Sequence, residues 1–151
     1  MKFNTRQFRN ALGCFATGVC VVTAKGDGGR MIGLTVNSFS SVSLKPPLVL
    51  WSLGRDSWAW DEFGRAKAFS VHVLGEVGRA LSQYFAKRNV KADAAHLRAL
   101  GRALAQLDCR IIARIEAGDH VIIVGRVLKF AHKQGKPLLY HRGRYGKLAE
   151  K

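Results

Sequence analysis

Small hydrogen-bonding side chains crowd one stretch of the sequence, residues 30–52 (RMIGLTVNSFSSVSLKPPLVLWS). A strand that only faced water would carry more Lys, Glu or Arg, and a strand buried on both faces would be apolar throughout. Short hydroxyls and an amide beside free backbone groups suit hydrogen bonding to a flat polar ligand along the strand. An edge strand that runs into a Ser-rich loop explains the composition equally well. The polar residues concerned are Thr35, Asn37, Ser38, Ser40, Ser41 and Ser43.

Two strands and a hairpin turn are predicted to position this stretch. Residues 19–25 are β-branched and form a short strand, and the GDGG turn at residues 26–29 leads into the polar strand. The two strands therefore pair antiparallel. Pro46 and Pro47 then stiffen the turn into a second apolar run, residues 48–53.

Four segments have helical patterns. Residues 4–17 begin with Asn4 and Gln7 in capping-box positions, and Phe8 and Phe15 are expected in the core. Residues 54–67 predict a loop and a short helix that Asp56 or Ser57 could cap. Residues 76–87 are amphipathic, and residues 88–102 are basic and Ala-rich, which predicts a further helix.

The remaining strands are connected mostly by hairpins. Residues 68–74, 107–116 and 120–132 have strand patterns, and the last two are joined by a turn at residues 117–119. One more short strand is expected near the end of the chain. About six antiparallel strands with short turns favour a small Greek-key barrel decorated by helices. A GxGxxG phosphate loop is absent, which disfavours a Rossmann dinucleotide site.

Composition is that of one globular domain, residues 1–151, with 48% hydrophobic and 23% charged residues. The net charge of +15 attracts polyanions, and it attracts phosphorylated small molecules such as dinucleotides equally well. The basic residues are scattered and no nucleic-acid motif is present, so nucleic acid is disfavoured as a partner. No apolar run approaches the roughly 20 residues of a membrane helix, and no signal-peptide core is seen, so we expect a cytoplasmic protein.

Three cysteines, Cys14, Cys20 and Cys109, have no metal-type spacing and lie among apolar neighbours. Buried free thiols are expected, without a disulfide or a metal site.

Four motifs in register resemble the short flavin reductases that supply reduced flavin to two-component monooxygenases and fold as an FMN-binding split β-barrel. They are F-x-x-A-L-G-x-F-A-T-G-V (residues 8–19), GLTVNSFSSVSLKPPLV (residues 33–49), GDH (residues 118–120) and GKPLLYHRGRYGKL (residues 135–148). Together they span nearly the whole chain in the order of the family.

The resemblance implies that residues 35–41 lie along the flavin. Their hydroxyl, amide and backbone groups would contact the edge of the isoalloxazine ring and the phosphate-bearing chain. The cofactor-binding residues expected here are Thr35, Val36, Asn37, Ser38 and Ser41.

The resemblance also implies roles for residues far from this strand. Ser52 and Ser57 would lie near the flavin phosphate, and Phe85 would approach the flavin or pack in the core. His120 and Tyr145 resemble positions that face the nicotinamide, where His120 would donate a hydrogen bond and Asp119 would orient it. We expect His120 to be the catalytic residue.

The activity implied is hydride transfer from NADH or NADPH to FMN or FAD. The cofactors carry this chemistry, so the protein has only to stack the rings in the correct orientation. A homodimer that completes each site from both subunits is expected, with a flavin-dependent monooxygenase as a partner. A non-catalytic flavin-binding split barrel and a basic nucleic-acid-binding barrel are the alternatives.

Two departures from the family pattern concern the edges of the site. Trp58 and Ala59 occupy positions where members often carry Ser or Thr, which leaves Ser57 as the remaining hydroxyl. Residues 86–106 lack the Gly- and Trp-containing loop that many members have there, which bears on substrate preference and reductase activity.

Overall fold

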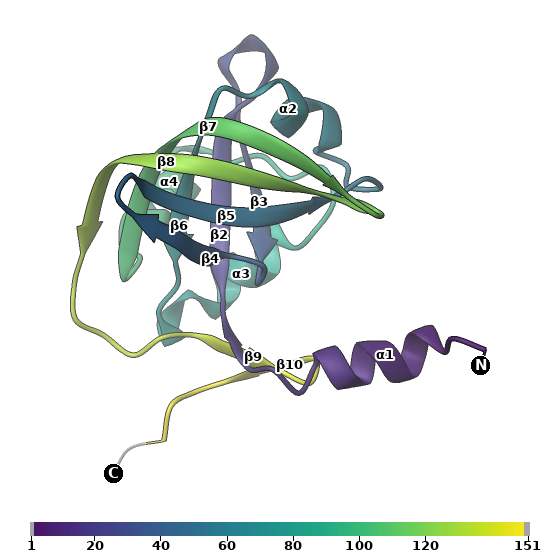
Figure 1. Ribbon diagram of the computed structural model, residues 1–151. Helices are drawn as coiled ribbons and strands as arrows, with labels where there is room; N and C mark the ends of the chain where they lie inside the picture. The colour runs from purple at the N-terminus through teal and green to yellow at the C-terminus, as the bar shows by residue number, and fades with distance from the viewer. Residues whose placement is uncertain (1, 150–151) are drawn as a thin grey trace.

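The computed structural model describes residues 2–149 as a strongly bent antiparallel sheet with helices on its outside and a separate lower arm (Figure 1). No helix within these residues is long and apolar enough to cross a membrane. Two short 3-10 turns, η1 (Asp27–Gly29) and η2 (Glu76–Gly78), interrupt the chain. The helices and strands are α1 (Thr5–Leu12), β1 (Thr17–Gly18), β2 (Cys20–Lys25), β3 (Met31–Val36), β4 (Ser40–Leu44), β5 (Pro47–Gly54), α2 (Trp60–Arg65), β6 (Ala68–Val73), α3 (Arg79–Phe85), α4 (Ala94–Leu100), β7 (Ala105–Ala117), β8 (His120–His132), β9 (Leu139–His141) and β10 (Arg144–Gly146).

The main sheet of the described chain has seven strands in the order β3-β2-β6-β7-β8-β5-β4, and a second sheet has three, whereas about six strands were predicted for the chain. Strand β5 lies beside β8 rather than beside β6, which gives the Greek-key connection. The polar stretch is therefore not one long strand: β3 and β4 form opposite edges of the sheet. Only residues 37–39 separate these two edges along the chain, and three extended residues span about 10 Å. The sheet must therefore curl toward closure, as in a split barrel.

The lower arm contains a second, three-stranded sheet in the order β1-β9-β10 (Figure 1). Its β9–β10 turn is tight, because Arg142 and Gly143 both have positive φ angles, of 48° and 76°. Tyr140 pairs with Tyr145 across this hairpin. Directly paired residues in an antiparallel sheet point to the same face, so the two tyrosine rings lie side by side, with their centroids 5.5 Å apart.

The inner face of the curled sheet forms the larger core. Trp51 and Phe63 are fully buried and meet edge to face, with ring centroids 5.0 Å apart. A smaller core lies on the outer face, under α3 and α4, where Phe85 and Leu100 are fully buried. The divergent segment at residues 86–106 thus covers the outside of the sheet, and its residue Ala92 donates a backbone hydrogen bond to Met31.

Helix α1 differs from prediction. Asn4 caps it as expected, but it ends at Leu12 and none of its residues is buried. Phe8 and Phe15 are 47% and 79% exposed, so their predicted place in the core is wrong, and so is the predicted burial of Cys14. The physical reason is visible in Figure 1, where α1 extends away from the main sheet.

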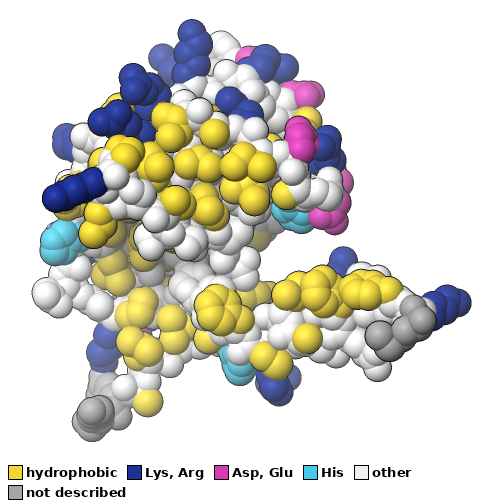
Figure 2. All heavy atoms as spheres, in the orientation of Figure 1, with side chains coloured by type: hydrophobic (Ala, Val, Ile, Leu, Met, Phe, Trp, Pro, Cys, Tyr) yellow, Lys and Arg dark blue, Asp and Glu magenta, His cyan; other side chains and the backbone are white. Residues whose placement is uncertain are grey.

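Apolar side chains are also exposed on the main sheet. Figure 2 shows hydrophobic side chains gathered over β8, β5 and β4, and along α1 on the arm. The four large examples on β4 and β8 are at least 49% exposed, and we call them the exposed sheet face. They are Val42, Leu44, Leu128 and Phe130.

Candidate functional site

A pocket of about 250 Å³ lies between the end of β3, helix α3 and the lower arm. It brings together three residues of the polar stretch and two tyrosines from the far end of the chain, of which Tyr145 was predicted as a site residue. The pocket is lined by Val19, Thr35, Val36, Asn37, Ser82, Ala86, Tyr140 and Tyr145.

Two hydroxyls of this pocket are held by the same residue of α3. Thr35 Oγ1 donates to the carbonyl oxygen of Ser82 at 2.6 Å, and the hydroxyls of Ser82 and Tyr145 are 2.7 Å apart. The ring of Tyr145 also lies under the guanidinium of Arg79, 5.1 Å from the ring centroid. The hydroxyl-bearing walls of the pocket are therefore fixed before any ligand arrives.

Ser82 and Tyr140 were not predicted as site residues. A signal for Ser82 was present, because it lies three residues before Phe85 and so occupies the buried side of the amphipathic helix. A hydroxyl on that side needs a partner. Tyr140 lies inside one of the quoted motifs, and its place beside Tyr145 follows from the two-residue turn between their strands.

Ser38 and Ser52 lie next to the pocket but not in its lining. Ser38 Oγ accepts a hydrogen bond from the backbone N–H of Ser52 at 3.0 Å and donates to its carbonyl at 3.3 Å. The Ser38 hydroxyl therefore joins the β3–β4 connection to β5. Ser41 is exposed on β4 and is not brought to the pocket.

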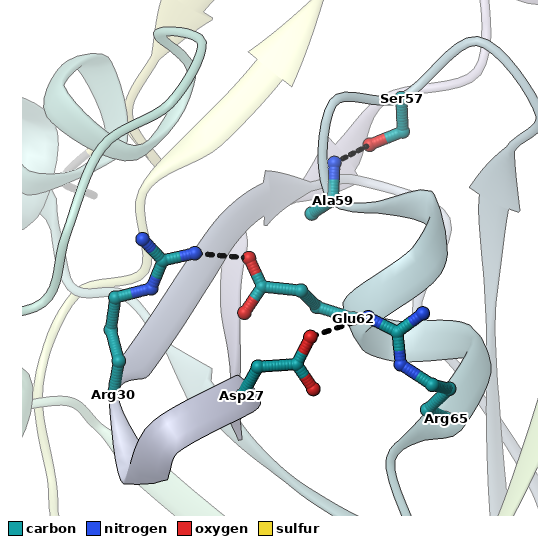
Figure 3. A network of polar contacts seen from close by, with 6 residues as sticks. All are labelled: Asp27, Arg30, Ser57, Ala59, Glu62 and Arg65. Carbon is teal, nitrogen blue, oxygen red and sulfur yellow. Dashed lines mark hydrogen bonds and ion pairs between the residues drawn. The ribbon is translucent and has the colours of Figure 1, made fainter.

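Ser57 stabilises the loop before α2. Its Oγ accepts a hydrogen bond from the backbone N–H of Ala59 at 3.3 Å, although it is not the N-cap residue. Figure 3 shows how the helix that follows is tied to the β2–β3 hairpin by two ion pairs. The pairs are Arg30 with Glu62 and Arg65 with Asp27, each with an N–O distance of 2.5 Å.

His120 lies at the tip of the β7–β8 hairpin, opposite Gly54 at the end of β5. Its Nδ1 is 2.7 Å from Asp119 Oδ1, so Asp119 orients the ring as predicted. The pKa of Asp119 is lowered below the usual range, first by its hydrogen bond with His120 and then by the electrostatic attraction of that histidine. The lining of the pocket does not include His120, so one chain does not bring this histidine to Tyr145.

Phe85 is fully buried in the smaller core. A Cβ placed on Gly33 would lie 2.7 Å from two carbons of its ring, so an edge of the ring packs directly against the backbone of β3. No surface of Phe85 is left for a ligand. The structure places Phe85 in the core, which is one of the two positions that the sequence left open.

A positive charge lies near Ser57 and His120. Arg55 donates through Nε to the carbonyl of Gly118, forms an ion pair with Glu116, and stacks over Trp60. Both its polar partners lie at the same hairpin tip as His120. In the described part of the chain no group of three His, Cys, Asp or Glu side chains could hold a metal ion.

Comparison with known proteins places the chain in one family. The model of the flavin reductase like domain matches residues 12–149. An FMN reductase (NADH) of Agrobacterium fabrum is 44% identical over 153 residues, covering 97% of this chain and 87% of the relative. An NADH:FAD oxidoreductase of Streptomyces globisporus, solved with NAD and FAD fragments, superposes with a TM-score of 0.87 at 32% identity, covering 97% of this chain and 93% of the other.

The flavin reductase of a styrene monooxygenase from Pseudomonas putida S12 superposes with a TM-score of 0.84 at 32% identity, covering 95% of this chain and 98% of the other. The matched region contains all the residues that line the pocket, from Val19 to Tyr145. Because the family model spans most of the sequence, this chain belongs to the flavin reductase like domain family.

Proposed function

We propose that this protein is an NAD(P)H-dependent flavin reductase that reduces FMN or FAD by hydride transfer. The observation that carries the proposal is the meeting of Thr35, Val36 and Asn37 with Tyr145 in one pocket, in a chain that belongs to this family. Relatives named as NADH-dependent reductases of FMN and of FAD support both flavins as substrates. The net charge of +15 favours the approach of these anionic nucleotides.

The chemistry of the pocket fits an isoalloxazine ring. Thr35 and Asn37 provide polar groups on one wall and Tyr145 on another, whereas Val19 and Val36 provide apolar surface. A flat ring with polar edges needs this combination. When bound, the flavin accepts a hydride from a reduced nicotinamide, and the protein has only to hold the two rings and exclude water.

Polar groups continue from the pocket toward the hairpin tip. Asn37 is followed by Ser38, which hydrogen-bonds the backbone of Ser52, and β5 then ends beside His120. We propose that the phosphate-bearing chain of the flavin follows these groups, with Arg55 as the nearby positive charge. His120 then binds the nicotinamide.

A second copy of the chain is proposed to complete the site. The pocket of about 250 Å³ is slightly smaller than the roughly 300–1,000 Å³ typical of ligand pockets, so a further wall is needed. The apolar residues of α1 and of the exposed sheet face are uncovered in the single chain, and apolar patches of this kind mark protein interfaces. A homodimer covers both surfaces.

The product, a reduced flavin, serves as a substrate for a flavin-dependent monooxygenase. A structural relative is the reductase of a styrene monooxygenase, and this supports an oxygenase as partner. We place the reaction in the cytoplasm, because reduced nicotinamide is supplied there.

The decisive experiment mixes the purified protein with FMN or FAD and follows the absorbance of NADH or NADPH. Oxidation well above the protein-free rate is expected. Flavin binding without oxidation would instead indicate a non-catalytic flavin-binding protein. Salt-sensitive binding of DNA or RNA without flavin binding would indicate the nucleic-acid alternative.

The dimer is tested by light scattering after gel filtration. Leu128→Glu places a charge on the exposed sheet face and is expected to give a monomer that binds flavin more weakly. Val77→Glu is the control, because Val77 is 92% exposed but lies in the 3-10 turn η2 before α3 and not on β4 or β8. An unaltered dimer in Leu128→Glu would place the interface elsewhere.

A further inference from the structure

Ser82 is an unusual residue at its position in α3. It is fully buried, and the helix around it contributes Phe85 to the smaller core. Ala is a better helix former than Ser, and an apolar residue would need no hydrogen-bond partner there. The hydroxyl therefore calls for a physical explanation, and its contact with Tyr145 supplies one.

Two walls of the pocket meet at Ser82. Its carbonyl accepts the hydrogen bond of Thr35 from β3, and its hydroxyl pairs with that of Tyr145 from β10. These partners are 47 and 63 positions away along the chain. One residue of α3 thus joins the polar stretch to the lower arm.

The contact with Thr35 also sets which hydrogen bonds the pocket offers. A threonine hydroxyl has one hydrogen, and Thr35 donates it to Ser82 at 2.6 Å. Only its lone pairs remain for the pocket, so Thr35 presents an acceptor to any ligand there. This selects a ligand group that carries an N–H or O–H donor.

The contact with Tyr145 fixes a phenol that would otherwise be mobile. Strand β10 has only three residues and is held by one neighbour, β9. The ring is positioned by Tyr140 and Arg79, and the hydroxyl is held at the bond to Ser82. Without that bond the hydroxyl can turn with the arm.

We infer that Ser82 is a positioning residue of the flavin site, which holds the Tyr145 hydroxyl toward the pocket through a direct hydrogen bond. This inference rests on the proposed function of the pocket. It assigns Ser82 no contact with the reacting atoms, because its side chain is fully buried. Its effect on binding must then pass through Tyr145.

A double-mutant cycle on flavin affinity tests this. Ser82→Ala and Tyr145→Phe are each expected to weaken FMN or FAD binding by about 2- to 10-fold, the effect of one hydrogen bond. In the double variant the loss is expected to equal that of Tyr145→Phe alone, since Ser82 acts only through that hydroxyl. The KM for flavin should rise by the same factor, with kcat changed by less than 2-fold.

Ser70→Ala is the matched control, because Ser70 loses a hydrogen bond to Asp108 on β7 and lies outside the pocket. It should leave flavin affinity unchanged. If Ser82→Ala does not fold, Ser82→Cys keeps the volume and a weak donor, and it is expected to give a smaller loss in the same cycle.

Unchanged flavin affinity in Ser82→Ala would overturn the inference, as would losses that multiply in the double variant with Tyr145→Phe. The latter result would show that Ser82 acts on the fold in general. A wild-type protein that binds no flavin would overturn the proposed function, and the inference with it. The wild-type titration therefore separates the two failures.

Discussion

Replacement of Thr35 by Val removes one hydroxyl from the pocket with little change in shape. Thr35 Oγ1 donates to the carbonyl of Ser82, but that carbonyl also accepts the backbone N–H of Ala86 at 3.0 Å. It is therefore not left without a partner in the variant. A net loss of about 0.5–1.5 kcal/mol in the free energy of unfolding is expected for the single hydrogen bond. For a domain of this size the melting temperature should fall by about 2–4 °C per kcal/mol.

The effect of Thr35→Val on ligand binding should be larger than its effect on stability. The oxygen of Thr35 faces the pocket as an acceptor, and Val leaves the donor of a bound flavin without a partner. Leaving a buried polar group unpaired costs about 1–3 kcal/mol, so the Kd for flavin should rise by about 5-fold or more. Quenching of flavin fluorescence measures this Kd at a fixed protein concentration.

Thr23→Val is the matched control on the neighbouring strand β2. The Thr23 hydroxyl lies 3.1 Å from Nε2 of His72, and both residues are buried. Its loss leaves a histidine nitrogen unpaired, so this variant should lose more stability than Thr35→Val and keep its flavin affinity. Equal flavin affinities in Thr35→Val and the wild type, or equal losses in both variants, would refute the placement of the ligand.

Three further predictions follow from contacts within the fold. Gly33→Ala would put a Cβ 2.7 Å from the buried ring of Phe85 and should lower the free energy of unfolding by about 1–3 kcal/mol. Gly64→Ala is the control, because the space around Gly64 is open and the free energy of unfolding should not decrease. Chemical denaturation measures both values. Burial lowers the pKa of His72, so between about pH 7 and 5 the unfolded chain takes up the proton that the folded chain resists. The free energy of unfolding should therefore decrease as the pH is lowered. The melting temperature of His72→Gln should decrease less than that of the wild type over this range. Equal slopes of melting temperature against pH in the two proteins would contradict this prediction. His120→Ala should raise the KM for NADH or NADPH more than it lowers kcat in steady-state assays, and the reverse pattern would give His120 a part in the chemical step.

The local elements were predictable because their signals are local. The glycines at residues 26–29 predicted the β2–β3 hairpin, and Asn4 predicted the start of α1. The prediction of a turn directly before His120 was likewise correct. Each depends on residues within a few positions of one another, where periodicity and turn chemistry act directly.

Burial was less predictable for an apolar helix face against which no other part of the described chain packs. The spacing of Phe8 and Phe15 indicates an apolar helix face, and that face exists, but nothing in the described chain covers it. Periodicity shows that a face is apolar and does not show what packs against it. The same limit explains Phe85, whose helical position fitted both the core and the site.

The sequence by itself determined most of the long strands, their hairpin turns and the family to which the chain is similar, because these follow from neighbouring residues and from motifs in order. Only the tertiary structure decided that the polar stretch divides between the two edges of one sheet, and that Thr35 and Tyr145 meet at Ser82. The reason is physical: these contacts join residues 47 and 63 positions apart, and their geometry is set by how the sheet curls and where α3 packs. No pattern of neighbouring residues shows which residues so far apart in the sequence will come into contact.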